Sequence, residues 1–140
     1  MITVEKVMQR ASEFGACNRS SKVSDWKSLS WMFFTPQGRE FCEENNFPTH
    51  AMFRQMKDDV AQYGVFVDCG DIQIKNSGKV ALIGETSAEL TYSGANEVHK
   101  VILMHGAKAR IAASSGAVIL LVNIGKCEVE IVKDETVIIL

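Results

Sequence analysis

Three histidines are the side chains in this sequence best suited to acid–base or metal chemistry, namely His50, His99 and His105. His99 and His105 are six residues apart, and an even separation on one continuous strand places two side chains on the same face. With Glu97 they could form a metal site or an acid–base cluster, because imidazole and carboxylate both bind metals and imidazole titrates near neutral pH. The competing interpretation is that both histidines are exposed or lie at chain corners, and we favour it. His50 falls in the first turn of a predicted helix, where the sequence offers no partner for a metal role.

The cysteines and the short motifs indicate no further chemistry. Cys17, Cys42, Cys69 and Cys127 form no C-x-x-C pair, and none has a histidine at zinc-finger spacing. The sequence also lacks the nucleophile-elbow, zinc-protease, phosphate-loop, dinucleotide-binding and EF-hand patterns. We therefore predict no catalytic residue, no metal and no cofactor. A small enzyme or ligand binder that uses the His99/His105 region is kept as the alternative.

Composition and charge exclude several classes of protein. The chain has 140 residues, of which 46% are hydrophobic and 23% charged, as in folded domains and unlike disordered chains. Its 15 basic and 17 acidic residues are spread evenly over both halves, which argues against a nucleic-acid-binding protein. That second alternative would require the basic residues of the N-terminal half to converge on one surface: Arg10, Arg19, Lys22, Lys27 and Arg54.

The sequence contains no recognisable export signal or membrane span. Charged residues occur as early as Glu5 and Lys6, and no apolar run of signal-peptide length follows them. No stretch approaches the roughly 18 apolar residues that cross a bilayer. We expect an intracellular, cytoplasmic protein with free thiols and no membrane contact.

Residues 1–64 are predicted to form about four short helices. Apolar residues recur at helical spacing, and each run is preceded by a residue that can cap a helix N-terminus. These caps are Thr3, Ser24 or Asp25, Thr35 followed by Pro36, and Thr49. The predicted ends are Gly15, Asn45–Asn46 and Gly64.

From residue 65 the sequence changes to short alternating runs that are separated by Gly, Ser, Asn and Asp. The last third repeats every ten residues, in blocks that begin at Ala107, Ala117, Cys127 and Val137. The first, third and fifth positions of these blocks are apolar throughout, and they share one strand face because side chains alternate along a strand.

This fixed period predicts a β-solenoid of about ten residues for each strand and corner, or twenty for each two-faced coil. We expect Ala109, Ile119, Val129 and Ile139 to stack in one continuous internal column. The alternative is an antiparallel meander or sandwich, which also has strands every 8–12 residues. Against it, the sequence has no Asn-Gly or Asp-Gly hairpin pair after Gly70.

The whole chain resembles a loose set of bacterial and prophage-type proteins of uncharacterised activity. The segments that carry the resemblance are T-P-Q-G-R-E-F-C-E-E-N-N-F-P from Thr35, G-V-F-V-D from Gly64, and the repeats from Ala107 to Leu140. The resemblance implies an N-terminal helical part joined to a short C-terminal β-solenoid, and an origin in a phage or mobile element. It implies no activity.

The predicted architecture is therefore α+β, with a helical cap region at residues 1–64 and a β-repeat region at 65–140 in one cooperative domain. The helical region can cap one end of the solenoid, whereas the other end is an apolar strand at 137–140. An uncovered apolar strand invites pairing with another chain, so we expect a second copy or another protein to cover it. Lateral packing through outward apolar residues would also give a dimer or trimer. The candidate interface residues are Trp31, Phe34, Val118, Leu120, Val122, Val137, Ile138, Ile139 and Leu140. We predict a non-enzymatic interaction module that self-associates.

Overall fold

The computed structural model describes residues 2–15 and 23–140, which form two compact units, Met1–Val65 and Phe66–Leu140. The boundary between the units lies one residue from the predicted boundary. Cys17, Arg19 and Lys22 lie outside the described residues.

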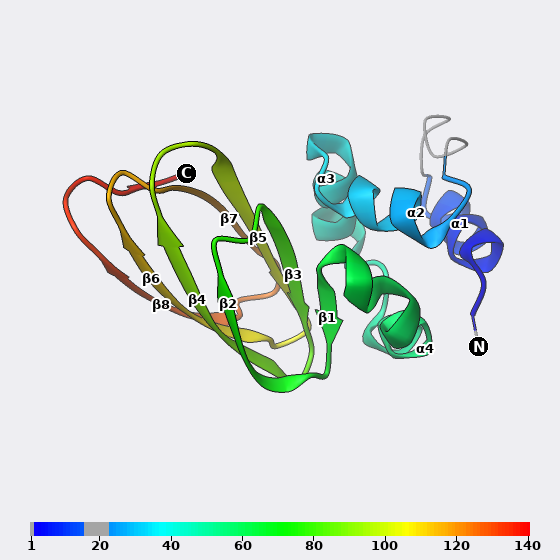
Figure 1. The fold of residues 1–140 in the computed structure, drawn as a ribbon. Helices are drawn as coiled ribbons and strands as arrows, with labels where there is room; N and C mark the ends of the chain where they lie inside the picture. Colours follow the sequence, from blue (N-terminus) through cyan, green and yellow to red (C-terminus); the bar gives the residue numbers. More distant parts are fainter. Residues whose placement is uncertain (1, 16–22) are drawn as a thin grey trace. The chain divides into compact units, whose positions relative to one another are not determined.

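The N-terminal unit contains the four predicted helices (Figure 1). They are α1 (Val4–Glu13), α2 (Trp26–Phe33), α3 (Pro36–Asn45) and α4 (His50–Val60), and the short 3₁₀ helix η2 (Ala61–Tyr63) follows α4. The predicted caps are confirmed. The hydroxyls of Thr3, Thr35 and Thr49 each accept a hydrogen bond from a backbone N–H of the first turn, and Asp25 forms a capping box with Ser28. No helix in the described part of the chain is both long and apolar enough to cross a membrane.

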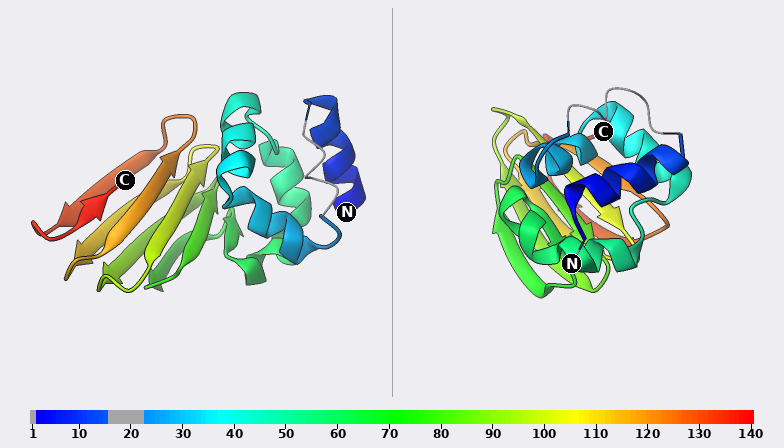
Figure 2. Two further views of the ribbon diagram at one scale, coloured as in Figure 1. Left: turned by 90° about the horizontal axis from the view of Figure 1, so that it is seen from above. Right: turned by 90° about the vertical axis from the view of Figure 1, so that its right-hand side faces the viewer.

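The C-terminal unit is a parallel β-solenoid, as predicted, and the antiparallel alternative is wrong. Its strands alternate between a five-stranded sheet, ordered β1-β3-β5-β7-β9, and a four-stranded sheet, ordered β2-β4-β6-β8. All the pairings from β2 to β9 are parallel. Figure 2 shows the strands side by side along the solenoid, with the last ones, in orange and red, at one end. The strands are β1 (Val65–Val67), β2 (Gly70–Lys75), β3 (Lys79–Ile83), β4 (Thr86–Ser93), β5 (Val98–Met104), β6 (Lys108–Ser114), β7 (Val118–Asn123), β8 (Glu128–Lys133) and β9 (Ile138–Ile139).

The repeat places equivalent residues above one another, but in two columns rather than the one we predicted. Ala109 is in register with Val129 in the four-stranded sheet, and Ile119 is in register with Ile139 in the five-stranded sheet. Successive ten-residue blocks therefore fall in opposite sheets, and one coil takes twenty residues. All four side chains belong to the same hydrophobic core.

Polar side chains at the corners connect one coil to the next. The carboxylate of Asp68 accepts a hydrogen bond from the backbone N–H of Glu85 at 2.7 Å, and the Thr136 hydroxyl accepts one from that of Gly116 at 2.8 Å. Several corners also need a backbone with positive φ, for example at Gly116, where φ is +78°. These contacts explain why each block ends in a polar or glycine-containing corner.

Candidate functional site

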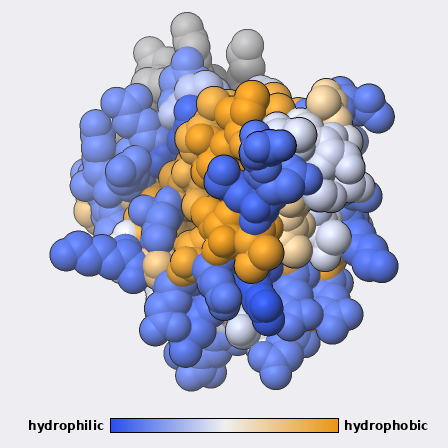
Figure 3. Space-filling model, turned by 90° about the vertical axis from the view of Figure 1, so that its left-hand side faces the viewer, coloured by the Kyte–Doolittle hydropathy of each residue, from blue (hydrophilic) through white to orange (hydrophobic). Residues whose placement is uncertain are grey.

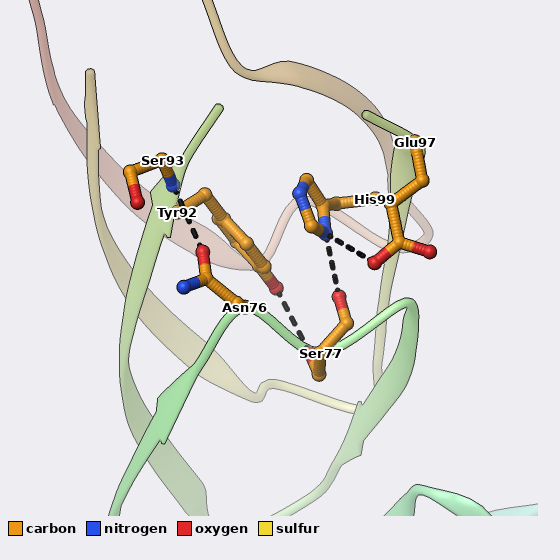
Figure 4. Close-up of polar contacts among 6 residues, drawn as sticks. All are labelled: Asn76, Ser77, Tyr92, Ser93, Glu97 and His99. Carbon is orange, nitrogen blue, oxygen red and sulfur yellow. Dashed lines mark hydrogen bonds and ion pairs between the residues drawn. The ribbon is translucent and has the colours of Figure 1, made fainter. Parts of the chain in front are cut away.

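His99 lies inside the solenoid rather than on its surface. It belongs to β5, pairs in register with the fully buried Ile119 of β7, and is only 3% exposed. Its ring lies against the ring of Tyr92 from β4, with ring centroids 4.5 Å apart and planes 31° apart (Figure 4). The imidazole therefore fills a core position between the two sheets.

Hydrogen bonds connect this ring pair to the corner between β2 and β3. Nδ1 of His99 lies 2.8 Å from the backbone carbonyl oxygen of Ser77 and must donate the proton, because a carbonyl only accepts. The Tyr92 and Ser77 hydroxyls are 3.4 Å apart, and a carboxylate oxygen of Glu97 lies 3.9 Å from the same His99 nitrogen. Burial raises the pKa of Tyr92, although the hydrogen bond with Ser77 acts in the opposite direction. The cluster shown in Figure 4 stabilises a corner of the solenoid.

His105 does not join His99 in a site. It follows the last residue of β5 and takes a corner conformation with φ of +56°, whereas His99 is the second residue of that strand. Six residues of extended chain separate the two by about 20 Å. The prediction that the two histidines form one site is therefore not supported. Even spacing can place two side chains on one face of a strand, but these two imidazoles are too far apart to act together. Within residues 2–15 and 23–140, no group of three or more His, Cys, Asp or Glu residues could hold a metal ion.

The last coil leaves apolar side chains uncovered. Ile138 is 53% exposed and Leu140 is 61% exposed, and Ile131 and Val132 of β8 are also exposed. Figure 3 shows the side of the molecule that lies at the left of Figure 1, where β8 is found, and hydrophobic side chains gather at its centre with hydrophilic ones around them. β8 is an edge strand of the four-stranded sheet, so its inward residues have a neighbouring strand on one side only.

The outward positions of β7 and β9 form an aliphatic surface, which we call the lateral strip: Val118, Leu120, Val122, Ile138 and Leu140. Val118 is in register with Ile138, and the backbone N–H of Leu140 continues the ladder by bonding to the carbonyl of Ile119 at 2.8 Å. The three side chains from β7 are half-buried. The neighbouring outward positions of β5 add one charged residue, Lys100, which is in register with Leu120.

The other predicted interface residues divide into exposed and buried ones. Trp31 is exposed on α2, as an interface residue must be, whereas Phe34 is buried and offers no free surface. Val137 is buried, and Ile139 packs against the core of the solenoid. Both side chains point inward, because residues alternate in direction along the chain on either side of the outward Ile138.

The outer face of the four-stranded sheet is charged, in contrast to the lateral strip. Lys108 and Glu128 are in register, with Nζ and a carboxylate oxygen 3.7 Å apart, and Arg110 and Glu130 are in register at 3.9 Å. The sequence already contained this signal, because two basic residues are followed twenty residues later by two acidic ones. The sequence does not show that the two acidic residues lie on an edge strand; the strand order does. Ile131 occupies the apolar fifth position of its block, and it is partly exposed because β8 has a neighbouring strand on one side only.

The helical unit contains an apolar cavity of about 230 Å³ among the described residues, with linings from α1, α2 and α3. Cys42 is its one thiol among those residues, and burial raises the pKa of this thiol to about 12. The thiol is therefore protonated at neutral pH, and the cavity contains no activated nucleophile.

Comparison of the chain with protein-family models, with curated proteins and with solved structures gives no match.

Proposed function

We propose that the protein is a non-enzymatic interaction module that self-associates through the lateral strip. The observation that supports this proposal is the contrast between the two outer faces of one solenoid. The four-stranded sheet presents charged ladders to solvent, whereas β7 and β9 present aliphatic side chains. Parallel strands that are apolar on both faces are typical of sheets covered on both sides.

A second copy of the chain is the partner that fits the strip best. Its five side chains carry no charge, so they provide nothing that would select a charged partner, and homodimer interfaces are more apolar than ordinary surfaces. A two-fold axis through the strip would place the same residues of both copies against each other, as in most dimers. Covering aliphatic surface contributes about 25 cal/mol for each Å² removed from water.

Light scattering coupled to size-exclusion chromatography tests the proposal. We expect a dimer at micromolar concentration, and Leu120→Lys should convert it to a folded monomer, because each copy would place a charge in the interface. Ala112→Lys is the matched control, since Ala112 is an exposed outward residue of the other sheet. A monomeric unmodified protein would overturn the proposal, and so would equal effects of the two substitutions.

The two alternative functions gain no support from a specific observation. An enzyme at the His99/His105 region would need the two imidazoles close together, but His99 lies near the start of β5 and His105 follows its last residue. Nucleic-acid binding would require Arg10, Lys27 and Arg54, which lie on three different helices, to converge on one surface.

We also propose a cytoplasmic location, which is supported by the free thiols of Cys42, Cys69 and Cys127. A phage or mobile-element origin rests on the sequence resemblance alone and stays a prediction.

A further inference from the structure

Charge alternates in sign from strand to strand across the outer face of the four-stranded sheet. Glu89 of β4, Arg110 of β6 and Glu130 of β8 occupy one column in register. In the adjacent column, Lys108 of β6 is in register with Glu128 of β8. Neighbouring strands are about 4.8 Å apart, so like charges at these positions would repel and opposite charges attract.

β8 is the strand at which this alternation stops. Its two outward glutamates each meet a basic residue on the β6 side, at 3.7 and 3.9 Å, and both glutamate side chains are largely exposed. Of its inward residues, Val129 is partly buried against the core and Ile131 is 37% exposed. The free edge of β8 thus presents acidic groups on the outside and aliphatic groups on the inside, together with a row of unpaired backbone groups.

We propose that the free edge of β8 binds an extended segment of another protein that has Lys or Arg at alternate positions and aliphatic residues between them. Such a segment adds as a further strand, with main-chain hydrogen bonds providing affinity and alternate side chains providing specificity. Its basic residues face Glu128 and Glu130, and its aliphatic residues cover Val129 and Ile131. The opposite neighbour of β8 shows this pattern, since β6 reads Lys-Ala-Arg-Ile from Lys108.

A second copy of this chain does not fit the edge. Its own β8 would place glutamates against glutamates, and its β2 would bring Asp71 and Gln73 at the corresponding outward positions. Among the described strands, β6 alone has two basic residues at alternate outward positions, and it is already paired with both β4 and β8. The edge of β8 and the lateral strip are therefore separate surfaces with different partners.

A synthetic peptide tests the proposal directly. A fluorescent peptide with the sequence of β6, Lys108–Ser114, is titrated with the full chain at low and high salt, and anisotropy is measured. We expect saturable binding that weakens with salt, because exposed ion pairs are screened. A peptide with both basic residues replaced by Glu should not bind, and one of the same composition with the two basic residues adjacent should bind at least about tenfold more weakly.

Charge reversal on the protein identifies the surface. The double variant Glu128→Lys/Glu130→Lys should bind the basic peptide with an affinity lower by about tenfold or more, and it should bind the acidic peptide, which the unmodified protein does not. The variant Glu43→Lys/Glu44→Lys changes the net charge equally on the exposed surface of α3 and should bind like the unmodified protein. Because new lysines would face Lys108 and Arg110 and could unfold the coil, Glu128→Gln/Glu130→Gln provides a milder second test, with a smaller loss expected.

Three results would overturn the proposal. The basic peptide fails to bind, the peptide with adjacent basic residues binds with the same affinity, or Glu43→Lys/Glu44→Lys loses as much affinity for the basic peptide as Glu128→Lys/Glu130→Lys. The proposal fails independently of self-association. Leu120→Lys should still bind the basic peptide at full strength, whether or not it changes the oligomeric state.

Discussion

Ile111 and Ile131 occupy equivalent inward positions of successive coils, in register on β6 and β8, yet Ile111 is fully buried and Ile131 is 37% exposed. The residue type, the strand position and the direction of the side chain are the same. The difference is that β6 has a neighbouring strand on both sides, whereas β8 has one on a single side. Burial of these inward residues is therefore set by the number of adjacent strands.

Alanine substitutions of Ile111 and Ile131 should lower the free energy of unfolding by different amounts. Ile111→Ala creates a cavity between two coils and should lower the free energy of unfolding by about 2–5 kcal/mol. Ile131→Ala removes a side chain that is already partly in water and should cost about 1 kcal/mol. Urea unfolding at low protein concentration measures both values, and equal costs would mean that the last coil is covered in solution.

Substitutions at the His99 ring should show that it is a structural group. His99→Ala removes the ring packed on Tyr92 and the donor to Ser77, and should destabilise the protein by about 2–4 kcal/mol. His99→Phe keeps a ring but loses the donor, so an intermediate loss of about 1–3 kcal/mol is expected. The control is Glu97→Ala, because this carboxylate is largely exposed, and it should change stability by less than about 0.5 kcal/mol. Thermal unfolding of the three variants checks the order, and a loss for Glu97→Ala equal to that for His99→Ala would contradict it.

The regular parts of this fold could be predicted from sequence because they depend on local chemistry. Thr3, Thr35 and Thr49 cap helices through bonds within one turn, so each cap is visible in a few neighbouring residues. The ten-residue period was equally visible, since stacked coils require apolar residues at repeated positions.

The candidate site could not be predicted in the same way, because its properties depend on which strands lie at the edge. Ile139 and Ile138 are adjacent and chemically identical, yet one packs inward and the other is exposed. His99 and His105 satisfied the even-spacing rule, but the strand ends before His105. The four residues predicted to stack in one internal column form two columns, one in each sheet. A ten-residue period alone does not show to which sheet each block belongs.

Asp134, in the corner between β8 and β9, should make the stability of the protein depend on pH in the acidic range. The Thr136 hydroxyl, together with the backbone N–H groups of Thr136 and Ser115, donates hydrogen bonds to Asp134 and lowers the pKa of this carboxyl below its ordinary 3.8. A carboxyl with a lowered folded-state pKa adds stability above pH 3.8, and this contribution is lost as the pH falls through the lower value.

Melting curves from neutral pH into acid test this expectation on the unmodified protein and Asp134→Asn. The unmodified protein should melt higher at neutral pH, and the difference should shrink below about pH 4 as Asp134 becomes protonated. Glu135→Gln removes one carboxylate from the same corner and corrects for net charge. A difference that stays constant with pH would show that the contribution does not depend on the charge of Asp134.

The buried thiol of Cys42 should be unreactive in the folded protein and should make stability depend on alkali. Burial raises its pKa from 9.0 to about 12, so at pH 8 to 9 almost none of it is the reactive thiolate. A short pulse of N-ethylmaleimide, followed by peptide mass mapping, should label the partly exposed Cys69 well before Cys42.

Because the folded-state pKa of Cys42 is raised, the stabilising contribution of this thiol is complete below pH 9.0 and is lost as the pH rises toward about 12. The variant Cys42→Ala should therefore show a flatter loss of stability over that range, and equal labelling rates of Cys42 and Cys69 in the native state would contradict the burial on which both expectations depend.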